Sequence, residues 1–290
     1  MFHLAVIGVS DAEARELGSR VHGATLAAAD ESDAAGDAVA VLEWVHGSLQ
    51  RVESSLAAGK PVLVSVQAGL SSEILQQLLE LGRTSGGRLT MANPFRFLPS
   101  RMLIHQQIDA GKLGAPGLIR VHRWECAHTM SRNPTPSGSL LCDLDLATWC
   151  FDRWPTLVYA VGFGSTDSTE RSGIQVHLGF PGGGMAMACH FDRLPSGDGY
   201  GSMVVIGSTG AAYSDDHQNT QLHFSGEIPR AIRTDEGIVS TTAMIQAFVR
   251  REHTSADATL AHWERIAALG EAVLESLETK RAVRPKVELP

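Results

Sequence analysis

The sequence predicts an α/β domain with a parallel sheet, followed by an α+β domain with an open antiparallel sheet. In the first third of the chain, short β-branched runs alternate with amphipathic helical segments, which is the order typical of parallel βαβ units. Past residue 95 the pattern changes to a helix and then to long alternating strands, which is typical of an antiparallel sheet. We therefore expect one domain over residues 1–95 and a second over residues 96–290.

Composition limits the classes of partner. The net charge of −8 and the pI near 5.8 argue against a nucleic-acid partner, which would need clustered Lys and Arg. The first apolar run, residues 2–8, is far shorter than the ~20 residues that span a bilayer. The four cysteines form no C-x-x-C pair and no secretory leader precedes them, so we expect reduced thiols and a cytoplasmic protein. No metal site is predicted.

The first domain is predicted to be a shortened Rossmann-like sheet. Residues 2–8 form a buried strand, residues 11–21 a helix and residues 24–30 a second strand. Only six residues, ESDAAG, separate Asp30 from Asp37 before the next strand at 38–42. Parallel neighbours need a connection of about a dozen residues or more, so no helix fits here. If the two strands flank the first one, the link between them must be nearly extended.

The phosphate-binding fingerprint of this fold is incomplete. G-x-G-x-x-G would need glycines at positions 8, 10 and 13, and the chain has Gly8, Ser10 and Glu13. Ser10 and Glu13 instead fit the S-x-x-E capping box, in which both side chains satisfy the free amide groups of the helix. A pyrophosphate would use the same amides and the same positive end of the helix dipole. We therefore expect the protein's own carboxylates to fill the anion site.

Two further βαβ units complete this domain. A helix carries Leu49, Val52 and Leu56 on one face and ends at Gly59. A strand over 61–66 leads to a helix capped by Ser71 or Ser72, which we expect to end at Gly82, and a short strand follows at 88–92. Parallel sheets place ligands at the carboxyl ends of their strands, so residues 65–67 are expected to lie at a site.

These segments resemble the Gfo/Idh/MocA oxidoreductases, the family of glucose-fructose oxidoreductase and inositol dehydrogenase. AAGKPVLV is similar to the family's AGKHVLVEKP, EWVHGSLQRVESSLAAGK to TPNHLHAELALAALEAGK, and NPFRFLP to the N-x-R-F-x-P hinge. The resemblance covers nearly the whole chain and implies an NAD(P)-dependent enzyme of sugars or polyols. In the family, however, the lysine of Glu-Lys-Pro carries the proton transfer, and this chain has Ser65-Val66-Gln67 there.

The resemblance also suggests ligand contacts. The positions that match cofactor contacts are Gly8, Ser10, Asp30, His46, Ser65 and Gln67. The positions proposed for substrate are Asn93, Arg96 and Asp145. Several have a structural alternative. Asp30 is also an ordinary turn residue, His46 an ordinary helix-capping or surface residue, and Arg96 a hinge cation paired to a local carboxylate. Asp145, like Asp143, is also compatible with a solvated helix face.

The helix over residues 138–154 resembles the family helix that supplies a catalytic Asp and His, in two possible registers. One register puts Cys142 on the histidine and Gly138 on the aspartate; the other puts Ala147 on the histidine and keeps Asp143 as the acid. Neither register yields a His. The remaining candidates for the acid or base are Asp143, Cys142 and a loop residue, His128, although a Cys on an apolar helix face usually serves packing.

The rest of the chain is strand-rich and closes with a long helix over 255–277. A glycine-rich turn, PGGG at 181–184, is followed by a strand in which Met185, Met187, Cys189 and Phe191 alternate on one face. Since the family pairs open sheet faces between subunits, the resemblance suggests a homo-oligomer through this sheet, with internal packing as the alternative. In the family, helices such as 255–277 return to cover the first domain.

The predicted function depends on which of the family's functional residues this chain keeps and which it lacks. We expect a degenerate member that binds a small sugar-like or polyol ligand, or a partner protein, without a firmly bound cofactor. The alternative is an active NAD(P)-dependent dehydrogenase of a sugar or polyol with a substituted acid or base. We favour the first, because the cofactor fingerprint and the proton relay have changed together.

Overall fold

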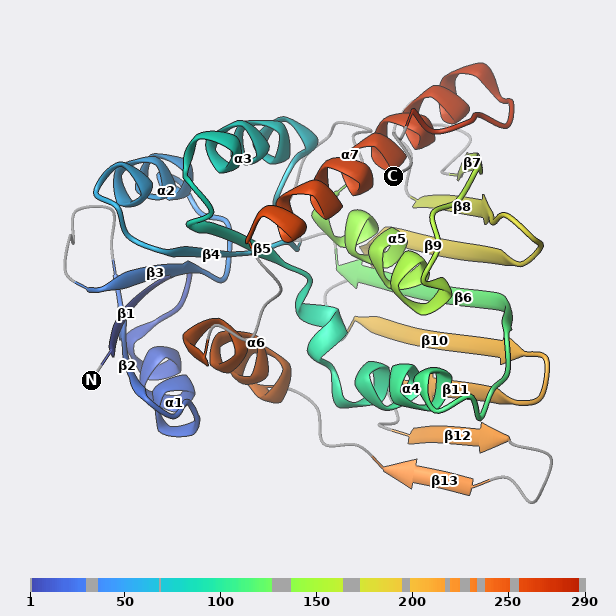
Figure 1. The fold of residues 1–290 in the computed structure, drawn as a ribbon, viewed down its shortest axis with the longest axis horizontal. Helices are drawn as coiled ribbons and strands as arrows, with labels where there is room; N and C mark the ends of the chain where they lie inside the picture. The colour runs from blue at the N-terminus through green and yellow to red at the C-terminus, as the bar shows by residue number, and fades with distance from the viewer. Residues whose placement is uncertain are drawn as a thin grey trace. The chain divides into compact units, whose positions relative to one another are not determined.

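A computed structural model describes residues 2–29, 36–67, 69–126, 137–163, 173–194, 199–216, 220–224, 230–233, 238–250 and 256–286. The chain divides into two compact units (Figure 1). Unit 1 comprises Met1–Phe97, Ser137–Ser139 and Gly237–Ala267. Unit 2 comprises Leu98–Pro136, Leu140–Glu236 and Ala268–Pro290.

The helices are α1 (Asp11–Arg20), α2 (Ser48–Ala57), α3 (Ser72–Thr84), the 3₁₀ helix η1 (Pro94–Phe97), α4 (Pro99–Asp109), α5 (Gly138–Phe151), α6 (Ile238–Arg250) and α7 (Ala256–Thr279). The strands are β1 (Phe2–Ile7), β2 (Ala24–Ala28), β3 (Ala38–Val41), β4 (Val62–Ser65), β5 (Leu89–Ala92), β6 (Pro116–Cys126), β7 (Leu157–Phe163), β8 (Gly173–Gly179), β9 (Met185–Leu194), β10 (Tyr200–Gly207), β11 (Ala211–Asp215), β12 (Thr220–Phe224) and β13 (Arg230–Arg233).

Unit 1 is built on a parallel sheet, as predicted. Within the described residues the strand order is β2-β1-β3-β4-β5, and each neighbouring pair is parallel. Helices α2 and α3 cover one face of this sheet, and α1 and α6 cover the other (Figure 1). Strands β2 and β3 therefore flank β1. Residues 30–35 lie outside the described part of the chain, so the absence of a helix between these strands stays a prediction.

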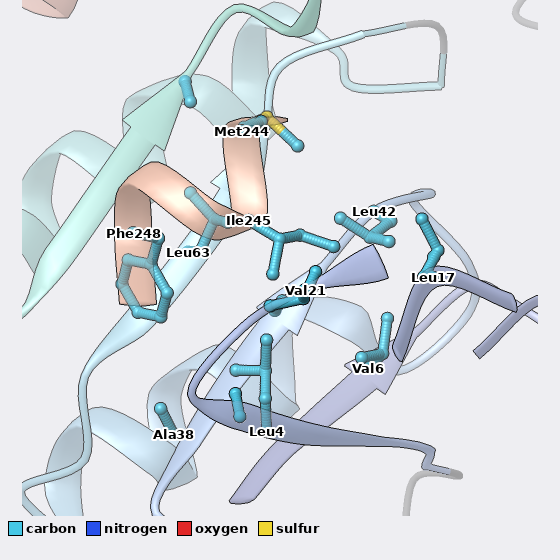
Figure 2. Close-up of a cluster of buried hydrophobic side chains, with 13 residues drawn as sticks. Leu4, Val6, Leu17, Val21, Ala38, Leu42, Leu63, Met244, Ile245 and Phe248 are labelled. Atoms are coloured by element: carbon cyan, nitrogen blue, oxygen red, sulfur yellow. The ribbon is translucent and has the colours of Figure 1, made fainter. Parts of the chain in front are cut away.

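The core of unit 1 joins segments from opposite ends of the sequence. Leu4 and Val6 of β1 and Leu17 of α1 pack in one buried cluster with Ile245 and Phe248 of α6 (Figure 2). Helix α6 thus fills the sheet face beside α1, where burial of apolar side chains stabilises the fold. The remaining buried members of the cluster are Val21, Ala24, Ala38, Ala40, Leu42, Leu63, Ala92 and Met244.

Helix α3 corrects one prediction from the sequence. The helix is capped by Ser71, whose hydroxyl accepts a hydrogen bond from the Ile74 amide at 3.2 Å, but it does not end at Gly82. It continues to Thr84. Gly82 is buried, and a Cβ there would lie 2.5 Å from Cδ1 of Leu260 on α7. The glycine therefore allows close packing of two helices instead of terminating one.

Unit 2 contains a mixed sheet rather than a purely antiparallel one. Its order in the described residues is β13-β12-β11-β10-β6-β9-β8-β7, and every neighbouring pair is antiparallel except β6 and β9. The exception arises because α5 is a crossover connection, so the chain leaves β6 and starts β7 in the same direction. The meander β7-β8-β9 then brings β9 alongside β6 in parallel. Strand β13 was not predicted, because RAIR has no clear apolar alternation.

Helix α4 is held to this sheet by a buried cation. The Arg101 guanidinium is fully buried and donates to both carboxylate oxygens of Asp216, at 2.5 and 2.6 Å, and to the Ser214 hydroxyl. A bidentate ion pair of this kind fixes both distance and orientation. The ring of His105 on α4 also stacks on Trp149 of α5, with centroids 3.9 Å apart. These contacts fix the two helices that cover this face of the sheet.

Candidate functional site

The amino end of α1 is closed by the capping box that the sequence predicted. The Ser10 amide and hydroxyl both donate to Glu13 Oε2 at 2.7 Å, and the Glu13 amide donates to the Ser10 hydroxyl at 3.3 Å. These hydrogen bonds, first from the hydroxyl and then from the amide of Ser10, hold the pKa of the Glu13 carboxyl below its ordinary value. Glu13 is therefore ionised at neutral pH, at the helix end where a pyrophosphate would bind.

Gly8, the one glycine left in the fingerprint position, is required by packing between loops. It has φ of +84°, and a Cβ on it would lie 2.5 Å from the carbonyl oxygen and 2.7 Å from the Cβ of Glu43. Only glycine fits where the chain leaving β1 meets the chain leaving β3. Gly8 is thus explained without any phosphate.

A pocket of about 200 Å³ opens at the carboxyl ends of β1, β3 and β4. It is lined by Val9, Glu13, Glu43, Ser65 and Gln67, together with residues of α1 and α6. The Gln67 side-chain amide donates to the Leu42 carbonyl and is thereby fixed in place. The volume is below the roughly 300–1,000 Å³ of most small-molecule sites, and two carboxylates lie on its lining. These residues do not fit the pyrophosphate of NAD(P).

Two other candidates of unit 1 also have structural partners. Asn93 is buried, and its side-chain oxygen accepts a hydrogen bond from the Phe95 amide at 2.9 Å at the start of η1. A guanidinium nitrogen of Arg96 lies 3.1 Å from Nε2 of His262 on α7. Close by, the Trp263 indole donates to the Met91 carbonyl at 2.9 Å. Both candidates therefore lie where the end of β5 meets α7.

His46 and Val66, which match a histidine and the catalytic lysine of the family, differ strongly in burial. His46 is exposed in the turn before α2, whose first residue follows Gly47 in the left-handed conformation. Val66, at the position of the family's lysine, is fully buried, and its amide donates to the Ala92 carbonyl at 2.8 Å. Valine has no exchangeable side-chain proton, and its side chain forms part of the core of unit 1.

In unit 2, Asp143 of α5 is part of a buried ion pair with Arg123 of β6. The Arg123 guanidinium donates to Oδ1 of Asp143 at 2.6 and 3.0 Å, and Oδ2 lies 3.2 Å from the Arg123 Nε. Burial alone would raise the pKa of the Asp143 carboxyl, but the charge and hydrogen bonds of Arg123, with His190 nearby, hold it below its usual range. Asp143 is therefore a carboxylate, which is a poor proton donor.

His190 of β9 belongs to the same cluster, and sequence reasoning missed it. Its Nδ1 lies 3.9 Å from Asp143 Oδ2 and its Nε2 lies 3.8 Å from Glu125 Oε2. His190 and Arg123 are paired in register across β6 and β9 and both are buried. The sequence contained a signal for His190. If residues 185, 187, 189 and 191 point outward from the sheet, residue 190 must point inward, and a polar residue at an inward position is uncommon.

The other candidates on α5 are also buried. Cys142 is fully buried, and Asp145 is 1% exposed. The Asp145 carbonyl accepts a hydrogen bond from the Thr148 hydroxyl at 2.9 Å. The structure thus groups Cys142, Asp143 and Asp145 on one helix of unit 2, and Gly8, Ser10, Ser65 and Gln67 around one edge of the sheet in unit 1. Asp30 and His128 lie outside the described residues.

Within the described part of the chain, no group of three or more His, Cys, Asp or Glu side chains could hold a metal ion. None of the helices in those same ranges has the length and apolar character needed to cross a membrane.

Sequence comparison finds a short, distant relative. No model of a known protein family matches the chain. Inositol 2-dehydrogenase of Klebsiella pneumoniae (strain 342) is 26% identical over 121 residues, which is 39% of this chain and 34% of that protein. The chain therefore matches only about a third of the length of this curated relative.

Solved structures match along almost the whole chain. An oxidoreductase from Agrobacterium radiobacter, in complex with NAD⁺, L-tartaric acid and magnesium, is 15% identical with a TM-score of 0.77, covering 99% of each chain. Aldose-aldose oxidoreductase from Caulobacter crescentus, complexed with glycerol, is 15% identical with a TM-score of 0.76, covering 98% of this chain and 99% of that one. Scyllo-inositol dehydrogenase from Lactobacillus casei, with NAD(H) and scyllo-inositol, is 17% identical with a TM-score of 0.71 and the same coverage.

These matches agree on the architecture. Each match covers both the parallel-sheet unit and the mixed-sheet unit of this chain, and each of the three matched proteins is an oxidoreductase. This protein therefore has the fold that the resemblance to the Gfo/Idh/MocA oxidoreductases predicted.

Proposed function

We propose that this protein is a degenerate Gfo/Idh/MocA homologue that binds a small sugar-like or polyol ligand, or a partner protein, without NAD(P)-dependent dehydrogenase chemistry. The observation that carries the proposal is the capping box at α1, which places the Glu13 carboxylate where a dinucleotide needs a free anion site. The ligand class comes from the fold relatives, whose structures hold glycerol and scyllo-inositol.

The missing proton relay supports the same proposal. Val66 replaces the family's lysine, and neither register of α5 places a histidine at the family's catalytic position. The Asp143 carboxylate forms an ion pair with Arg123 inside unit 2, so it is poorly suited to exchange a proton with a substrate hydroxyl. Oxidation of an alcohol by hydride transfer leaves a proton that a basic group must accept, and such groups typically contribute ~10²–10⁴-fold to the rate.

The alternative is an active NAD(P)-dependent dehydrogenase of a sugar or polyol with a substituted acid or base. It is favoured by the fold relatives whose structures contain NAD⁺ or NAD(H). In that case unit 1 would hold the nicotinamide nucleotide, which accepts or donates the hydride. His128 or Asp143 would exchange the proton with the substrate hydroxyl.

We predict that titration of the purified protein with NADH and with NADPH will show no saturable binding up to about 1 mM, near the top of the usual range of KM values. The measurement is nucleotide fluorescence or calorimetry, with the Lactobacillus casei scyllo-inositol dehydrogenase, whose structure holds NAD(H), as positive control. Micromolar binding of either nucleotide would refute the proposal. A Ser10→Gly, Glu13→Gly double variant tests the cause, because it removes the capping side chains, and binding gained there would locate the loss at α1.

A homodimer through the sheet of unit 2 is part of the proposal. Large apolar side chains on its outer face are exposed, including Tyr159, Val161 and Phe163 of β7 and Met185 of β9. Contiguous apolar surface of this kind usually marks an interface. We expect Val161→Glu to halve the sedimenting mass, while Lys112→Glu, at an exposed loop residue of the same unit, leaves it unchanged. A monomeric wild type would contradict this.

Further assignments complete the proposal. Unit 1 serves as the nucleotide-binding-type domain of the fold, and unit 2 as the substrate and dimerisation domain. A reducing, cytoplasmic setting agrees with the free cysteines Cys142, Cys150 and Cys189.

A further inference from the structure

The first turn of α2 contains a buried cation that has no counter-charge. Arg51 is 7% exposed, and its Nε is buried without a hydrogen-bond acceptor. Within the described part of the chain its guanidinium also forms no ion pair and no ring contact. An arginine side chain cannot lose its proton in a protein, and a buried charge without a partner is strongly unfavourable. A bound anion would explain why this guanidinium is there.

The amino end of α2 places further hydrogen-bond donors beside this cation. The helix follows Gly47, which has φ of +81° and provides no side-chain cap, and the first turn contains no acidic residue. The backbone amides of Leu49 and Gln50 have no acceptor among the described residues. The Ser48 hydroxyl instead accepts a hydrogen bond from the Val45 amide at 3.0 Å. This helix end therefore presents free N–H groups and the positive end of the helix dipole.

Helix geometry directs the Arg51 side chain toward these amides. The Cα–Cβ bond of a helical residue leans toward the amino end, so its side chain covers the preceding turn. For Arg51 this is the turn over residues 47–50, where Gln50 is exposed and a ligand could enter from solvent. The guanidinium and the helix end carry charge of the same sign, so each makes the other less favourable unless an anion binds to both.

Packing of the helix does not account for an arginine at this position. Val52 and Leu56 of α2 are buried apolar residues, and the similar family segment, TPNHLHAELALAALEAGK, has a leucine where this chain has Arg51. The aliphatic part of an arginine can pack in the same way, but the buried charge adds a cost that a leucine avoids. At α1 the carboxylate of Glu13 satisfies the helix end, and α2 has no such group in its first turn.

We propose that the amino end of α2 binds a compact oxyanion, a phosphate or a carboxylate, through the Arg51 guanidinium and the amides of Leu49 and Gln50. Two oxygens of either group match the planar fork of a guanidinium, and helix amides bind the same oxygens. The anion is either free or the acidic group of a larger ligand. This site goes beyond the proposed function, because it requires neither a nucleotide nor a polyol.

The test uses sodium phosphate and sodium acetate as probes. Each is titrated at pH 7 into the isotopically labelled full chain, with sodium chloride adjusted to hold the ionic strength constant, and NMR follows the backbone amide and arginine Nε–H signals. We expect at least one probe to give saturable shifts centred on Leu49, Gln50 and the Arg51 Nε–H, with a Kd of about 10 mM or tighter, well within the affinity ceiling for so small a ligand. Tighter phosphate would indicate a phosphate-bearing ligand, and tighter acetate a carboxylate; either result supports the site.

Variants then assign the contact. Arg51→Leu should weaken the bound probe at least about tenfold, since it removes charge-assisted hydrogen bonds. Arg51→Lys keeps the charge but loses the planar fork, so it should weaken the probe less than Arg51→Leu does. Arg15→Leu is the matched control, because Arg15 is an exposed arginine of α1 in the same unit, and its Kd should stay within about twofold of wild type.

Three outcomes would overturn the inference. The first is a wild-type protein in which neither probe gives saturable shifts at residues 49–51, a result that needs no variant to fold. The second is wild-type affinity in a folded Arg51→Leu protein, and the third is equal weakening in Arg15→Leu and Arg51→Leu. The nucleotide titration is read separately. Micromolar NADH binding would refute the proposed function and leave this site standing, whereas absence of anion binding would refute this site alone.

Discussion

Asp143→Asn should lower the free energy of unfolding by about 3–5 kcal/mol at pH 7, because it leaves a buried guanidinium without its counter-charge. Arg123 and Asp143 are 6% and 0% exposed, and no water can take over the lost interaction without opening the packing of α5 on β6. The measurement is the free energy of unfolding in urea, followed by circular dichroism and by tryptophan fluorescence. Trp149 of α5 serves as a fluorescent probe in the same unit.

The pH dependence of this effect has a definite sign. Because the folded-state pKa of Asp143 is lowered, its stabilising contribution is present in full above the unfolded-state pKa, which is near 3.9 for an Asp. The contribution is lost as the pH falls through the still lower folded-state pKa. The stability difference between wild type and Asp143→Asn should therefore be constant between pH 6 and 8 and should shrink only in strongly acid solution.

Asp109→Asn is the matched control for Asp143→Asn. Asp109 pairs with His105 at 3.0 Å, but its side chain is 64% exposed. Exposed pairs contribute about 0–1 kcal/mol, so this variant should differ from wild type by less than about 1 kcal/mol. Equal effects of the two variants would contradict the assignment of a buried ion pair. A catalytic Asp143, in contrast, would be expected to lower activity on a polyol with little loss of stability.

The architecture could be predicted from the sequence because local periodicity determines it. The strands of unit 1 lie where short apolar runs separate the helical segments, and the capping box at Ser10 and Glu13 follows from residue type and spacing alone. The misses involve contacts distant in sequence. Gly82 was assigned to a helix end because the sequence cannot show that Leu260 packs against it. The parallel pairing of β6 with β9 depends on the path of a crossover helix.

The candidate site was harder to predict than the fold. The spacing rules located Ser65 and Gln67 at a sheet edge, and the structure places both on the lining of one pocket. The same rules could not show that Thr241 and Ile238 of α6 complete it, since that requires knowing where a helix about 170 residues later in the chain packs. Asp143 was proposed as an acid from its residue type, but its state is decided by Arg123, which lies on a different strand.

Gly8→Ala should destabilise unit 1 by about 3 kcal/mol or more. A non-glycine residue at φ of +84° costs roughly 1–2 kcal/mol, and the added Cβ would also overlap the backbone of Glu43, which cannot move like a flexible side chain. The measurement is the free energy of unfolding in urea, with the fluorescence of Trp44, next to Glu43 in the chain, as a local probe.

Gly59→Ala separates the two parts of that cost. Gly59 has nearly the same φ, +77°, but an added Cβ there would meet no atom within 4 Å. Gly59→Ala should therefore cost only the backbone term of about 1–2 kcal/mol, and the excess in Gly8→Ala measures the overlap with Glu43. If both variants lose the same stability, the contact with Glu43 does not explain Gly8, and the glycine would again be available as part of a phosphate-binding loop. A clear excess would instead mean that the glycine is kept for the junction of β1 and β3, so that its presence is no argument for a nucleotide.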